Sequence, residues 1–177
     1  MTQIALSEKQ TEQFSLWVAD YIAEQRAVFR RKAKPIPTDR KTKLLPFFPS
    51  DVLDHVLVTS GQAPEPSFYK QLHTLGITNA PPFSQMAGIT FQDLIVHTES
   101  LSDRLLFHEL VHAVQYKHLT LRGFAERYVR GFLSGGSYEE IPLEKQAYAL
   151  EAKFAARPDD AFSVEADVEK RIRDGLI

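Results

Sequence analysis

One short stretch of the chain combines residue types that can hold a metal ion and move a proton. Residues 107–112 read F-H-E-L-V-H and contain an H-E-x-x-H motif. On an α-helix of about 3.6 residues per turn, His108 and His112 lie one turn apart on the same face and can point at one ion. Zn²⁺ is the usual ion for such a pair. Glu109 can then take a proton from a metal-bound water instead of binding the metal.

A catalytic zinc site usually has a third protein ligand, and His118 is the nearest candidate. It stands where the third histidine of the pattern H-E-x-x-H-x-x-G-x-x-H falls, but Gln115 replaces the glycine that lets the chain leave the helix. If the helix continues, the six residues after His112 advance it by about 240°, so His118 points away. Met1 and Met86 both precede the motif, so no methionine turn can follow it. We therefore expect His118 to be an exposed histidine near a helix C-terminus.

A glutamate from a later helix is the other candidate, and Glu144 fits best. It falls in the first turn of a helix predicted over residues 141–157, where Pro142 suits the first helical position and strong helix formers follow. Ala147 is small enough to let this helix approach the motif helix closely. Glu151 lies on the same face two turns further on, where it could orient one of the histidines. The structural alternative for Glu144 is a first-turn glutamate favoured by the helix dipole.

Periodicity and turn residues predict the elements that must position these side chains. Residues 1–34 form an N-terminal helical segment, in which Ser7 is the cap and aromatic residues recur at helical spacing. Residues 88–118 are a strand followed by the H-E-x-x-H helix, with Ser100 or Ser102 as its cap. The strand can be two short strands that meet at residues 92–93. A further amphipathic helix is expected over residues 119–133, and a last one over residues 164–174.

Composition restricts the class of protein. A chain of 177 residues is long enough for one domain with a substantial core, so we expect a single domain over residues 1–177. The absence of cysteine excludes disulfides, thiolate-bound zinc and thiol nucleophiles. A net charge of −2 gives no reason to expect nucleic-acid binding. No signal peptide and no apolar run of about 20 residues is present, so we expect a cytoplasmic protein without a membrane partner.

The motif and the later glutamate together resemble the gluzincin branch of the zinc metallopeptidases. More narrowly, H-E-L-x-H-x-x-Q-Y followed by P-L-E-x-x-A-Y is similar to a group of small bacterial zincin-like proteins. The resemblance implies an α+β, zincin-like fold that is predominantly helical, with a small mixed β-sheet, an active-site helix and a glutamate helix. It also implies Zn²⁺ held by His108, His112 and Glu144, with Glu109 as general base and a peptide or protein as substrate. One departure is Tyr148, which stands where larger gluzincins have an aspartate that supports the first histidine.

Two functions fit these residues. The first is a zinc metallopeptidase, a hydrolase in which Tyr148, Tyr138, Tyr128 or His97 could stabilise the oxyanion and the strand over residues 87–92 could pair with an extended peptide. The alternative is a weak or inactive zincin-fold protein in which a structural zinc supports a binding or adaptor module. A ferritin-like di-iron site is discounted because the chain has no second E-x-x-H unit of the required kind. The sequence indicates neither the substrate nor the oligomeric state.

Overall fold

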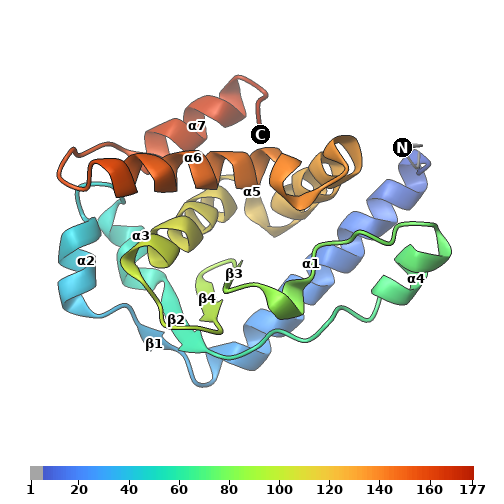
Figure 1. Ribbon diagram of the computed structural model, residues 1–177, viewed down its shortest axis with the longest axis horizontal. Helices are drawn as coiled ribbons and strands as arrows, with labels where there is room; N and C mark the ends of the chain where they lie inside the picture. The colour runs from blue at the N-terminus through green and yellow to red at the C-terminus, as the bar shows by residue number, and fades with distance from the viewer. Residues whose placement is uncertain (1–5) are drawn as a thin grey trace.

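The computed structural model describes residues 6–177 and has a predominantly helical, mixed α/β architecture (Figure 1). Two long helices, α1 and α5, cross the molecule, and a small sheet lies beside them. In chain order the elements are α1 (Glu8–Arg30), β1 (Lys34–Pro35), α2 (Thr38–Leu44), α3 (Ser50–His55), β2 (Leu57–Ser60), α4 (Tyr69–Thr74), η1 (Phe83–Gln85), β3 (Gly88–Phe91), β4 (Leu94–His97), α5 (Asp103–Gly135), η2 (Tyr138–Glu140), α6 (Pro142–Ala156) and α7 (Val164–Arg173).

The predicted N-terminal helix is present as α1, with the expected cap. The Gln10 backbone N–H donates to Ser7 Oγ at 3.3 Å, and the Ser7 backbone N–H donates to Gln10 Oε1 at 2.9 Å, which together make a capping box. Its buried face includes Phe14, Val18 and Ile22 and packs against α5 and the sheet. Residues 1–5 of the predicted segment 1–34 lie outside the described residues, and the helix itself ends at Arg30.

The sheet is mixed and has the strand order β1-β2-β4-β3. β2 and β4 are parallel, whereas β1 with β2 and β3 with β4 are antiparallel. The strand expected from residue 88 is therefore two strands joined by the tight turn Gln92-Asp93, as the sequence allowed. Gln92 has a φ of 62°, and the Asp93 carboxylate accepts hydrogen bonds from Arg26 and Arg30 of α1. The arrangement leaves β3 at the edge of the sheet.

The helix with the histidine motif begins where the sequence indicates. The Leu105 backbone N–H donates to Ser102 Oγ at 3.0 Å, so Ser102 rather than Ser100 is the cap. The helix expected separately over residues 119–133 is the second part of α5. Thr120 breaks the helix between the two parts with φ 64° and ψ 169°, a conformation that β-branched residues rarely adopt. α5 ends at Gly135 and is capped by Gly136, whose φ of 76° is left-handed.

The predicted glutamate helix, α6, runs alongside α5, and α7 also packs against α5 (Figure 1). Leu143 and Ala147 are fully buried on the face of α6 that meets α5. Gly131 makes this approach possible, because a Cβ there would lie 2.6 Å from Pro142 Cδ at the start of α6. The buried apolar residues of all these elements form one cluster. No helix within residues 6–177 has both the length and the apolar character needed to cross a membrane.

Candidate metal centre

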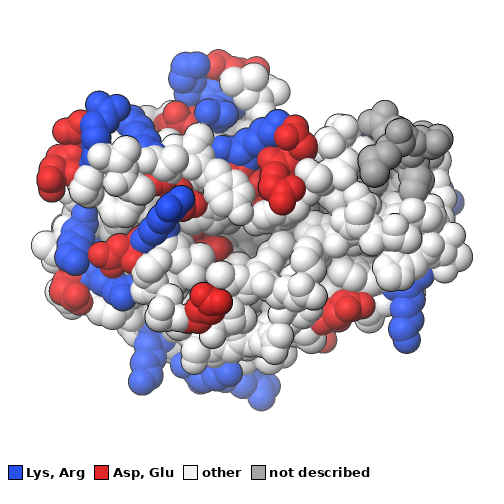
Figure 2. Space-filling model, viewed as in Figure 1, with Lys and Arg blue, Asp and Glu red and all other residues white. Residues whose placement is uncertain are grey.

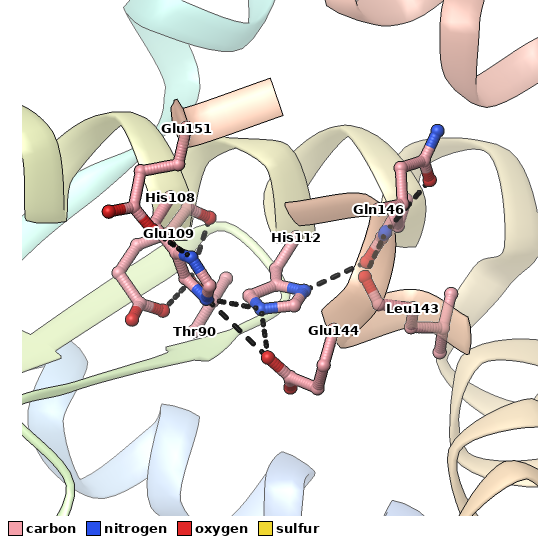
Figure 3. A network of polar contacts seen from close by, with 9 residues as sticks. Thr90, His108, Glu109, His112, Leu143, Glu144, Gln146 and Glu151 are labelled. Carbon is pink, nitrogen blue, oxygen red and sulfur yellow. Dashed lines mark hydrogen bonds and ion pairs between the residues drawn. The ribbon is translucent and has the colours of Figure 1, made fainter. Parts of the chain in front are cut away.

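Three side chains from two helices converge on one point between α5 and α6 (Figure 3). His108 Nε2 lies 3.4 Å from Glu144 Oε2, and His112 Nε2 lies 3.3 Å from the same oxygen. The two Nε2 atoms are 3.2 Å apart. All three side chains are buried, with residue exposures of 5%, 5% and 3%. The helical spacing of the histidines and the packing of α6 on α5 together produce this convergence.

The three contacting atoms have the spacing that a small tetrahedral cation requires. Four ligands at about 2.0–2.1 Å from a tetrahedral zinc ion are separated from one another by about 3.3–3.4 Å. The three measured separations are 3.2, 3.3 and 3.4 Å. Glu144 Oε2 is buried and accepts no hydrogen bond from any residue of the described chain, although both nitrogens lie near it. A buried carboxylate oxygen rarely stays without a partner, so a cation at this point would satisfy it. Two imidazoles and a carboxylate therefore fit zinc.

The electrostatics of the three groups are strongly coupled. Burial alone would lower the pKa of His108, but the nearby carboxylates of Glu144 and Glu151 outweigh it and raise that pKa to about 10. The pKa of His112 is raised as well, because Glu144 outweighs the effect of burial. Burial acts to raise the pKa of Glu144, yet the two histidines hold it well below its usual value. The site thus carries a negative potential that favours a positive charge between the side chains, whether protons or a metal ion provide it.

Glu151 holds the first histidine in place. His108 Nδ1 donates to Glu151 Oε2 at 2.9 Å, which leaves the Nε2 lone pair of the neutral ring for the metal position. Arg104 donates to the other oxygen of Glu151. The sequence singled out Glu151 for this role, and the side chain occupies that position. Tyr148 lies over the His108 ring, with ring centroids 4.6 Å apart, and does not provide a carboxylate, so Glu151 is the acidic partner of His108.

Gln115 holds the second histidine. His112 Nδ1 donates to Gln115 Oε1 at 2.8 Å. The Gln115 amide then donates to the Leu143 carbonyl and to Gln146 Oε1, both at 3.0 Å. The Gln146 amide in turn donates to Asp167 Oδ1 of α7 at 2.7 Å. Because each amide can donate only through its nitrogen, this series fixes the His112 tautomer with Nε2 free for the metal.

Glu109 lies beside the two histidines on the side of β3. Thr90 Oγ1 donates to Glu109 Oε2 at 2.7 Å and also approaches the Glu109 carbonyl at 2.9 Å. Glu109 is 4% exposed, and burial raises its pKa. Gly88 leaves room for this side chain, because a Cβ there would lie 2.7 Å from Glu109 Oε1. A carboxylate with a raised pKa, held by one hydroxyl, is suited to accept and return a proton.

The remaining candidates occupy other places. His118 is not part of the triad. Its Nε2 lies 3.0 Å from Glu165 Oε1 of α7, and the residue is partly rather than fully exposed. His97 Nδ1 donates to the Glu99 carbonyl at 2.7 Å, at the outer end of β4. Tyr128 and Tyr138 line a cavity that also contains Glu109, His112 and Glu144. Tyr148 is 44% exposed above His108.

Sequence reasoning missed three contributors to the site. Gln115 belongs to the sequence motif without an assigned role, and no pattern assigns a role to Gln146 or Thr90. Gln115 and Gln146 are both fully buried, but only the folded structure reveals this. In the sequence, a glutamine fits any position of a helix, so its type does not indicate burial. Thr90 lies on the inward side of an alternating strand, and that alternation was the one sequence feature that could have indicated it.

Comparison of the chain with protein-family models, with curated proteins and with solved structures finds no match. The geometry of the site is therefore the basis for inferring what the protein does.

Proposed function

We propose that this protein is a zinc-dependent metallopeptidase with a zincin-like fold, in which His108, His112 and Glu144 hold Zn²⁺ and Glu109 is the general base. The observation that carries the proposal is the convergence of three buried ligand atoms at separations of 3.2–3.4 Å, next to a glutamate that is not part of the triad. A purely structural zinc site usually has four protein ligands, and a fourth is absent from the group formed by the described residues. An open position favours catalysis.

Zinc, when bound, would lower the pKa of a water and polarise the substrate carbonyl. Glu109 would accept the proton of that water on its carboxylate and later deliver it to the leaving amine. Its burial supports this role, because burial raises the pKa of Glu109 and so makes its carboxylate easier to protonate near neutral pH. Thr90 orients the carboxylate through its hydroxyl.

The position of β3 supports a peptide substrate. Within the described sheet β3 pairs only with β4, so its other edge offers free backbone groups beside Glu109. Figure 2, in the same view as Figure 1, shows the surface of the molecule hollowed near its centre, below α6, with mainly uncharged side chains around the hollow. An extended peptide could therefore lie along β3 with its carbonyl near the metal position.

The test combines metal analysis with hydrolysis of broad peptide libraries. The wild-type protein should bind one zinc ion, and Glu109→Gln should keep that zinc while losing about 10²–10⁴-fold in rate. Glu139→Gln is the control, because Glu139 is an exposed glutamate outside the site and should leave both properties unchanged. Glu144→Ala should weaken zinc binding, and an unchanged zinc affinity would remove Glu144 from the ligand set.

The rival function is an adaptor with a structural zinc. A zinc-loaded wild-type protein that cleaves no member of the library would favour this rival. Loss of zinc from Glu109→Gln would also count against the proposed role of Glu109 as a base.

A further inference from the structure

A partly open cavity of about 50 Å³ lies beside the candidate metal centre and extends to α1. Its walls come from α1, the segment before β3, β3 itself, both parts of α5, η2 and the start of α6. Glu109, His112 and Glu144 are part of its lining, so a substrate side chain bound in the cavity would lie next to the candidate metal centre.

The size and walls of the cavity restrict its occupant. About 10–15 Å³ is needed to hold one water, so the cavity has room for about three to five groups of that size. Aliphatic and aromatic side chains form most of the wall, which disfavours a charged group. Glu109 and Glu144 are part of the lining and further disfavour a carboxylate. Phenylalanine, tyrosine, tryptophan, lysine and arginine side chains are all too large.

One polar atom in the wall has no partner. Tyr128 Oη is buried and makes no hydrogen bond with any of residues 6–177, and the residue as a whole is 8% exposed. Two neighbouring tyrosines differ in this respect, because Tyr21 Oη donates to the Pro64 carbonyl at 2.6 Å and Tyr69 Oη donates to the Pro81 carbonyl. A buried hydroxyl without a partner is costly and rare. A ligand that offers an acceptor would satisfy it.

We propose that this cavity is the specificity pocket of the site and takes an uncharged side chain of three or four non-hydrogen atoms that carries a hydrogen-bond acceptor, such as threonine or asparagine. Tyr128 Oη donates to that acceptor, and the apolar wall contacts the rest of the side chain. This inference rests on the proposed peptidase function, since it names the class of residue that the site selects.

The test uses two probes of equal shape, N-acetyl-threonine N-methylamide and N-acetyl-valine N-methylamide. Threonine and valine differ only by a hydroxyl in place of a methyl group, so their ratio of affinities isolates the hydrogen bond. Binding to the zinc-loaded protein is followed by NMR through the backbone amides of residues that line the cavity. The threonine probe should bind about three- to tenfold more tightly, as expected for one neutral hydrogen bond.

Two tyrosine-to-phenylalanine variants separate the role of the Tyr128 hydroxyl from the effect of removing any buried tyrosine hydroxyl. Tyr128→Phe should abolish or reverse the preference for threonine, because the acceptor then loses its donor in an apolar wall. Tyr69→Phe is the matched control, since its hydroxyl points to Pro81 and not to the ligand, and it should keep the preference. Tyr128→Phe should also leave the midpoint of thermal unfolding unchanged or higher, whereas a tyrosine with a merely structural hydroxyl would show a lower midpoint in its phenylalanine variant.

The outcomes distinguish the two proposals. Binding with the expected preference, but without cleavage of any peptide, supports the pocket and rejects the peptidase. Cleavage of peptides with equal affinity for the two probes, or an unchanged preference in Tyr128→Phe, rejects the pocket and leaves the peptidase. Absence of binding by both probes at the cavity also rejects the pocket.

Discussion

His108 on α5 donates from Nδ1 to Glu151 Oε2 on α6 at 2.9 Å, across 43 positions of sequence. This hydrogen bond ties the orientation of a candidate metal ligand to the register between two helices. Since α6 also carries Glu144, one helix supplies both a ligand and the support of another ligand. The metal centre is therefore a property of the α5–α6 pair rather than of the H-E-x-x-H helix alone.

Replacing Glu151 by alanine should lower the zinc affinity about 10–100-fold, as is typical when the partner of a metal-bound histidine is removed. The ring would lose the acceptor that fixes its tautomer, while all three ligands remain. Competition with a chromophoric chelator measures the affinity. Arg104→Ala is the graded control, because Arg104 contacts only the other oxygen of Glu151 and is itself largely exposed, so its effect should be smaller. Equal zinc affinity in Glu151→Ala and the wild type would show that the hydrogen bond does not support the metal.

Gln115→Leu should reduce both zinc affinity and stability. The substitution removes the acceptor of His112 Nδ1, the donor to Gln146 Oε1 and one donor to the Leu143 carbonyl, all in a fully buried position. Unpaired buried groups of this kind cost about 1–3 kcal/mol, which chemical denaturation of the metal-free protein would detect. Gln13→Leu is the control, because Gln13 is an exposed glutamine of α1. A variant with normal stability and normal zinc affinity would contradict the proposed role of Gln115.

The sequence predicts the parts of this molecule whose signals are local. The cap of α1, the paired short strands and the spacing of His108 and His112 each depend on residues within one turn or one hairpin. Glu144 could be inferred because a first-turn glutamate after Pro142 has a fixed place on its helix. The series from His112 through Gln115 to Gln146 could not, because it depends on the packing of α6 and α7 against α5. Helical periodicity predicts two helices that meet at residues 118–119, but no pattern predicts that the exposed Thr120 makes the break with a φ of 64°.

Asp93 should stabilise the fold in a pH-dependent way. Burial acts to raise the pKa of Asp93, but hydrogen bonds from Arg26 and Arg30 outweigh it and lower that pKa. A carboxyl with a lowered pKa in the folded state stabilises the fold above its unfolded pKa of about 3.9, and this contribution is lost as the pH falls through the folded pKa. Asp93→Asn should therefore cost about 1 kcal/mol at pH 7, and the difference should shrink below about pH 4.

Urea denaturation of the wild type and Asp93→Asn at several pH values measures this difference. Asp159→Asn is the control, because Asp159 is an exposed aspartate between α6 and α7, outside this cluster. A difference between wild type and Asp93→Asn that grows as the pH falls would contradict the assignment of Asp93 as the charged partner of α1.

Gly88→Ala should separate catalysis from metal binding. A Cβ at this position would lie 2.7 Å from Glu109 Oε1 and 3.1 Å from Glu109 Cδ, so the carboxylate or β3 must move. The three proposed ligands are not among the atoms that the new methyl group would meet. A displaced base of this kind costs about 100-fold in rate, so hydrolysis should fall by about that factor while one zinc ion stays bound.

Gly123→Ala is the matched control for this variant. A Cβ at Gly123 would meet its nearest atom, Arg127 Nη1, at 3.4 Å, and the position lies in a helix where alanine is favoured. Gly123→Ala should therefore keep both zinc and hydrolysis and should be slightly more stable than the wild type. If Gly88→Ala loses its zinc, the substitution disturbs the whole centre. If it keeps full hydrolysis, the position of Glu109 set by Gly88 and Thr90 does not limit the reaction.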